Sequence, residues 1–178
     1  MKRIVWTFGL IAGAIMAVMM AITIPFADHS GKWEVIGYTT MILAFLMVYF
    51  GIRTYRDNSL AGTIRFGQAF KVGILITLIA STCYVGAWEI IYRTMVPDFM
   101  EKYAAKMVAN SRAEGASEAA IDRQKTKMAA MVEGYKNPVV RAGYTYLEVF
   151  PVGLVVVLVS AGVLSRRKSG DIPEPARA

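Results

Sequence analysis

The chain has 178 residues, of which 56% are hydrophobic and 19% are charged, and its formal net charge is +7. An ordinary soluble domain carries about 25% charged residues, so this composition argues against a soluble globule and against a disordered chain. One cysteine, six prolines and no triplet glycine pattern argue against a disulfide scaffold and a collagen-like chain.

Four apolar stretches are long enough to cross a bilayer core, which takes about 20 helical residues. They cover residues 4–26, 35–52, 70–92 and 142–164. The first follows Lys2 and Arg3, as in a signal peptide, but it is longer than the roughly 7–15 apolar residues of such a peptide. Because the runs are continuous rather than alternating, we expect helices and not a barrel. The sequence therefore predicts an all-α membrane protein, with residues 1–164 as one polytopic domain.

Residues 98–136, between the third and fourth spans, form the longest water-facing stretch. Phe99, Tyr103 and Met107 recur at four-residue spacing, which predicts an amphipathic helix that ends near Gly115. Ser117 is a suitable N-cap for a second helix. We therefore expect a helical hairpin outside the cytoplasm, acting either as a spacer or lid without a ligand or as a surface for a partner.

The distribution of lysine and arginine predicts the orientation, because short cytoplasmic flanks carry an excess of basic residues. With a cytoplasmic N-terminus, basic residues outnumber acidic ones in the cytoplasmic segments. Both termini are then cytoplasmic, and the polar segment 165–178, with Pro173 and Pro175, is predicted to be a disordered tail. Most basic residues lie beside spans, so the net charge does not require a nucleic acid as partner.

The connection between the second and third spans is predicted to lie at the inner membrane interface. It contains Asp57-Asn58-Ser59 and Gly62, which are typical of turns. Its basic residues are candidates for contact with anionic lipid head groups or with a partner. These residues are Arg53, Arg56, Arg65 and Lys71.

Two acidic residues, Glu89 and Glu148, fall within predicted spans, near the outer boundary. An acid in hydrocarbon costs on the order of 2–3 kcal/mol near the bilayer centre, so it should face the bundle and be paired or protonated. Arg93 and Arg141 are the neighbouring basic residues. One hypothesis is that arginines and hydroxyl groups satisfy both acids and set the helix register. The other is a polar site, open to the outer face, for a proton, a cation or an amine.

Small residues mark the packing faces of two spans. The first span has a four-residue ridge of Gly9, Gly13, Ala17 and Ala21, which we expect to pack within the monomer rather than between copies. The third has a ridge that leads to Glu89, so the acid shares the face that contacts other helices. Its members are Gly73, Thr77, Ser81 and Val85.

Motifs for enzyme chemistry are not found in the sequence. There is no nucleophile motif, phosphate loop, haem motif or nucleotide fingerprint. His29, with Asp28 and Glu34 nearby, matches no metal signature. We therefore predict no catalytic residue, no cofactor and no metal site, and a protein that is not an enzyme.

Three short motifs carry a family resemblance. They are Gly51-Ile52-Arg53-x-Tyr55-Arg56-Asp57, Gly62-x-Ile64-x-Phe66-Gly67-x-Ala69-Phe70-x-x-Gly73 and Pro97-Asp98-Phe99. Together they resemble the domain of unknown function 4199 family of bacterial integral membrane proteins, over nearly the whole chain. The resemblance implies a four-helix protein of the bacterial inner membrane. It implies no activity and transfers no functional residues.

The resulting prediction is a structural, accessory or partner-binding component of the inner membrane. Its partners would be the lipid bilayer and either a second copy of the chain or another membrane protein. The alternative is a small transporter or channel subunit that uses Glu89 and Glu148. Four spans leave little room for a pathway, so that alternative requires a dimer or a larger ring.

Overall fold

The computed structural model describes residues 1–24 and 32–166, and these residues form six α-helices and no strand. The helices are α1 (Lys2–Thr23), α2 (Lys32–Ser59), α3 (Phe66–Thr94), α4 (Phe99–Ala113), α5 (Glu118–Tyr135) and α6 (Pro138–Leu164). Asp28 and His29, the side chain of Glu34 and the predicted tail beyond residue 166 lie outside the described part of the chain. The all-α prediction is confirmed for the described ranges.

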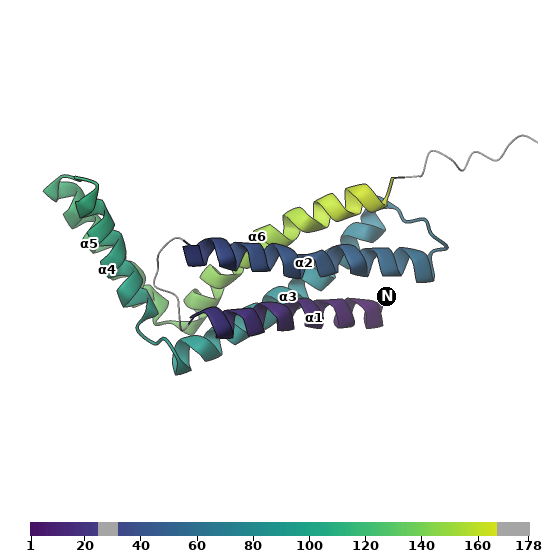
Figure 1. Ribbon diagram of the computed structural model, residues 1–178, viewed down its shortest axis with the longest axis horizontal. Coiled ribbons are helices and arrows are strands. Elements are labelled where there is room, and N and C mark those ends of the chain that lie inside the picture. Colours follow the sequence, from purple (N-terminus) through teal and green to yellow (C-terminus); the bar gives the residue numbers. More distant parts are fainter. Residues whose placement is uncertain (25–31, 167–178) are drawn as a thin grey trace, which may run out of the picture.

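Four of the helices, α1, α2, α3 and α6, are long and apolar enough to cross a membrane. They run side by side as a bundle (Figure 1). Both α1 and α6 pack against α2 and α3, and α2 also contacts α3. The four long apolar stretches predicted from the sequence therefore form the four helices of one bundle.

Glycines allow the bundle helices to approach closely. A Cβ atom on Gly13 would lie 2.5 Å from the Cβ of Cys83 in α3, and one on Gly9 would lie 2.8 Å from Ile79. On α6, a Cβ on Gly153 would lie 2.5 Å from Thr77. The glycines of the first predicted ridge thus pack within the monomer, as expected, although Ala21 at its end is exposed.

The bundle core has two parts. Around its middle and toward the α2–α3 connection it is mainly aliphatic, with Phe45, Ile76 and Val157 fully buried. At the opposite end it is aromatic and includes Trp88 and Tyr135. The ridge predicted on α3 is buried as expected, and among the described residues the hydroxyls of two of its members have no hydrogen-bond partner; these members are Thr77 and Ser81.

The connection between α2 and α3 is shorter than predicted, at residues 60–65. The prediction of a turn at Asp57-Asn58-Ser59 is wrong, because α2 continues to Ser59. An ion pair between Arg53 and Asp57, one helical turn apart with Nε and Oδ2 3.6 Å from each other, supports this polar extension. The chain reverses at Gly62, whose φ of +84° confirms a turn there.

The predicted segment 98–136 contains α4 and α5, which lie side by side and extend at an angle from one end of the bundle (Figure 1). The turn between them includes Gly115, with a φ of +77°. Ser117 caps α5, because its Oγ accepts a hydrogen bond from the amide of Ala120. The α4–α5 pair meets the bundle where α5 turns into α6 and where side chains of α4 and α5 pack around Trp88. We call the end of the bundle that carries α4 and α5 the α4–α5 end, and the end that carries the α2–α3 connection the loop end.

Candidate functional site

The turn from α5 into α6 positions the first candidate residue. Asn137 caps α6 by accepting a hydrogen bond from the amide of Val139 at 2.9 Å, and Pro138 occupies the first turn, where its missing amide is tolerated. The helix therefore starts four residues before the predicted boundary at residue 142. As a result, Arg141 lies inside α6, and its side chain is only 3% exposed.

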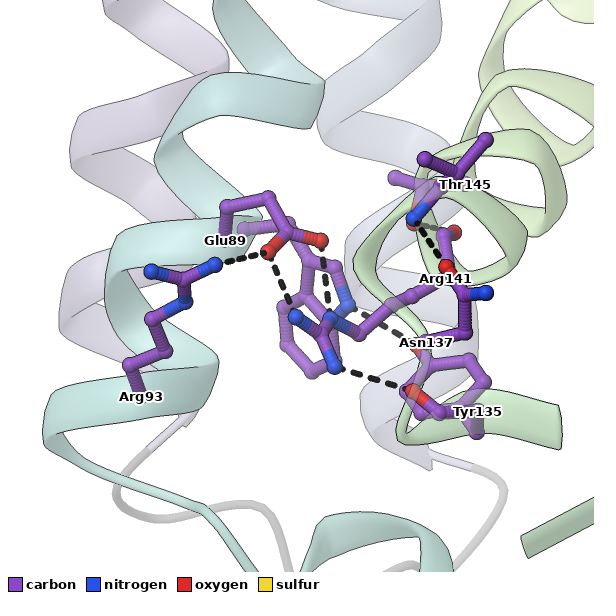
Figure 2. A network of polar contacts seen from close by, with 8 residues as sticks. Glu89, Arg93, Tyr135, Asn137, Arg141 and Thr145 are labelled. Atoms are coloured by element: carbon purple, nitrogen blue, oxygen red, sulfur yellow. Dashed lines mark hydrogen bonds and ion pairs between the residues drawn. The ribbon is translucent and has the colours of Figure 1, made fainter. Parts of the chain in front are cut away.

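Arg141 and Glu89 form a two-point ion pair between α6 and α3 (Figure 2). Nε of Arg141 donates to Oε1 of Glu89 at 2.8 Å, and Nη2 donates to Oε2 at 2.6 Å. Arg93, one turn along α3, lies on the other side of the carboxylate at 3.7 Å. Three of the four predicted residues are thus brought together, with the Glu89 carboxylate between two arginines.

Each of the three guanidinium nitrogens of Arg141 donates a hydrogen bond. Its Nη1 donates to the backbone carbonyl of Tyr135 at 2.9 Å, and its Cζ lies 4.1 Å from the centre of the Tyr92 ring. The hydroxyl of Thr145 donates to the carbonyl of Arg141 at 3.0 Å, one turn along α6. This network ties the end of α5 to α3 and α6, which is a structural role.

Glu148 is separate from this network. It follows Arg141 by seven residues, which is about 10 Å along the helix axis. No hydrogen bond or ion pair joins it to another of the described residues, and its side chain is accessible. It lines a cavity of about 540 Å³ at the α4–α5 end of the bundle. The two acids therefore do not share a site, because Glu89 is held at the level of Arg141.

The cavity is lined mainly by methionine and aromatic side chains, which come from all six helices. α1 and α2 contribute methionines, and α3 contributes Tyr84 and Trp88. α4 and α5 contribute Met100, Tyr103 and Tyr135, and α6 contributes Tyr144, Thr145 and Glu148. The α4–α5 pair therefore forms part of the cavity wall.

A buried hydrogen bond joins two of these lining residues. Nε1 of Trp88 donates to the hydroxyl of Tyr135 at 2.8 Å, and the Trp88 ring packs edge-to-face on Phe99. Burial raises the pKa of the Tyr135 phenol. Trp88 is buried because α4 and α5 fold over it. In the sequence, two features could have indicated that Trp88 has a polar partner. They are its position near the end of a span and the tyrosines near it in the chain.

The predicted inner-face residues gather at the loop end. Asp57 accepts from Nε of Arg56 at 2.7 Å and also pairs with Arg53, so it is the partner of two of the arginines. Arg65 precedes α3, and Lys71 is exposed on its first turns. Arg53, Arg65 and Lys71 are exposed, and Arg56 is partly buried.

The described residues contain no group of three or more histidine, cysteine, aspartate or glutamate side chains placed to hold a metal ion. Four apolar helices of membrane-spanning length and a semi-enclosed aromatic cavity define the class as helical proteins suited to a membrane.

Within that class, the chain belongs to the family described as "Protein of unknown function (DUF4199)", whose model matches residues 7–166. The resemblance predicted from the three short motifs is thereby confirmed. No curated protein and no solved structure matches the chain.

Proposed function

We propose that this protein is a multi-pass component of the bacterial inner membrane that holds a small ligand or part of a partner in the cavity at the α4–α5 end. The role is accessory and binding rather than catalytic. The observation that carries this proposal is the cavity itself. Its volume of about 540 Å³ falls within the range of roughly 300–1,000 Å³ that is usual for ligand pockets. Residues from all six helices line it, so an occupant could contact each helix.

The proposed orientation has both termini in the cytoplasm and α4–α5 outside. Met1 and the end of α6 lie at the loop end, with the basic residues of the α2–α3 connection (Figure 1). Cytoplasmic flanks are enriched in lysine and arginine, which supports this orientation. Arg65 and Lys71 would then meet anionic head groups, while the half-exposed Phe66 ring reaches the acyl boundary.

The alternative is a transporter or channel subunit. This alternative needs both acids to be free to bind a transported ion, but Glu89 is paired with two arginines. Among the described residues, buried side chains such as Phe45 and Ile76 fill the aliphatic core toward the loop end, which argues against a route along the monomer axis. A pathway would have to form between copies of the chain. We therefore favour the binding role.

Cavity filling tests the binding role. Both Gly37, which lines the cavity, and Gly162, which does not, have open space where a side chain would start. In a chain with Trp6 and Trp33 replaced by Phe, Trp88 reports on the cavity by energy transfer to the neutral dye N-phenyl-1-naphthylamine. In nanodiscs we expect saturable transfer in the parent chain and in Gly162→Phe, and loss of saturable transfer in Gly37→Phe. Equal transfer in both variants, or none in the parent, would overturn the proposal.

A further inference from the structure

The charge on the described cavity lining is negative. Among the described residues that line it, Glu148 is the only one with a formal charge. The nearest arginine along its own helix, Arg141, is already engaged by Glu89. A carboxylate beside apolar walls is stabilised by a positive charge or by a proton. Since the described part of the lining provides no basic side chain, we expect a positive charge to come with the occupant.

The walls match an organic cation better than a metal ion. A hard metal ion needs several oxygen ligands, whereas the described lining offers one carboxylate and neutral hydroxyls. Aromatic rings attract cations through their faces and commonly enclose substituted ammonium groups. Tyr84, Trp88, Tyr135 and Tyr144 supply such rings, and methionines supply adaptable apolar surface.

Tyr144 and Thr145 lie one turn before Glu148 on α6, and all three line the cavity. A ring, a hydroxyl and the carboxylate are therefore presented on the same side of one helix. The methionines of α1 and α2 form the remaining apolar wall, which suits the hydrocarbon part of an amphipathic molecule.

We propose that the cavity binds a lipophilic organic cation, an amine or a quaternary onium compound, with its charge beside Glu148 and its apolar groups among the tyrosine, tryptophan and methionine side chains. This inference rests on the binding role proposed above. It names the class of ligand and the residue that selects it.

Two probes of the same shape and opposite charge test this selection. Tetraphenylphosphonium is a cation, and tetraphenylborate is its anionic counterpart. Binding of each is measured by equilibrium dialysis to the protein in nanodiscs of zwitterionic lipid, with empty nanodiscs subtracted. We expect saturable binding of the cation only. Glu148→Gln should weaken it by about ten- to hundredfold, as for loss of a charge-assisted contact.

Matched variants separate a local effect from a change in net charge. Glu101→Gln removes the same charge from the exposed surface of α4, outside the cavity lining, and should bind the cation like the parent chain. Glu148→Asp keeps the charge and should retain most of the binding. Folding of every variant is checked by saturable energy transfer from Trp88 to the neutral dye.

The outcomes distinguish the two proposals. Equal binding of the cation by the parent and Glu148→Gln, or equal binding of cation and anion by the parent, would overturn the choice of ligand. If the neutral dye still binds saturably in that case, the proposed binding role stands. If neither the dye nor the cation binds the parent chain, both proposals fail.

Discussion

Arg141 of α6 holds Glu89 of α3 by two parallel contacts of 2.8 and 2.6 Å. The pair lies where α5 turns into α6, and the same guanidinium also binds the carbonyl at the end of α5. Bidentate contacts between arginine and carboxylate fix both distance and orientation. The pair therefore sets how α6 sits on α3, and with it the position of the cavity wall that carries Glu148.

Loss of Glu89 should destabilise the fold strongly. Glu89→Ala leaves the Arg141 charge buried without its partner, and breaking such a pair costs about 3 kcal/mol or more. The change is measured as the free energy of unfolding in detergent micelles. Arg93→Ala is the matched control, because the Arg93 side chain is 65% exposed and its loss should cost under about 1 kcal/mol. Equal losses in the two variants would contradict the structural role of the Arg141 pair.

Deleting one oxygen atom, the phenol oxygen of Tyr135, removes its hydrogen bond with Trp88. Tyr135→Phe leaves the buried Nε1 of Trp88 without an acceptor, which should cost about 1–3 kcal/mol of stability. Thermal unfolding measures the loss. Tyr144→Phe removes a phenol oxygen from a half-exposed ring in the same cavity and should be close to neutral. An unchanged melting temperature for Tyr135→Phe would show that this bond is not formed.

The Tyr135 phenol also predicts a response to alkaline pH. Burial raises its pKa above the ordinary value of 10.0. The folded state therefore favours the protonated phenol, and the stability that this provides is present below pH 10 and lost as pH rises through the folded pKa. Between about pH 10 and 12, the melting temperature of Tyr135→Phe should fall less steeply than that of the parent chain. Parallel curves would contradict burial of this phenol.

Packing of α1 on α3 should not tolerate a methyl group at Gly13. The new Cβ would lie 2.5 Å from the Cβ of Cys83, so Gly13→Ala should cost about 1–3 kcal/mol in unfolding free energy. Gly162→Ala is the control, since its Cβ would meet nothing within 4 Å. It should be neutral, or slightly stabilising because alanine favours a helix. A neutral Gly13→Ala would mean that the two helices are farther apart.

The proposed orientation is tested with single cysteines. In a Cys83→Ala background, Asn110→Cys on α4 and Asn58→Cys near the end of α2 place thiols at exposed positions at opposite ends of the molecule. In bacterial spheroplasts, a membrane-impermeant maleimide should label Asn110→Cys at once and Asn58→Cys only after lysis. The reverse pattern would invert the orientation, and labelling of both in intact cells would overturn the membrane-spanning arrangement.

Much of the fold could be predicted from local patterns in the sequence. Continuous apolar stretches predict long helices because the number of residues needed to cross a bilayer is set by helix rise. The glycines of α1, the turn at Gly62 and the cap at Ser117 were predictable because each depends on the properties of one residue type. Helix ends were less predictable, since Arg53 and Asp57 support helix beyond the apolar stretch.

The tertiary structure alone decided what the two acids do. From the sequence, Glu89 and Glu148 are equivalent, as each has an arginine within two helical turns. The start of α6 at Pro138 brings Arg141 to Glu89, and the fold of α4 and α5 over Trp88 forms a cavity beside Glu148. Ion pairing and cavity formation depend on contacts between residues distant in the chain. Hydrophobicity and spacing along one helix carry no information about those contacts, because they depend on how separate helices are placed in space.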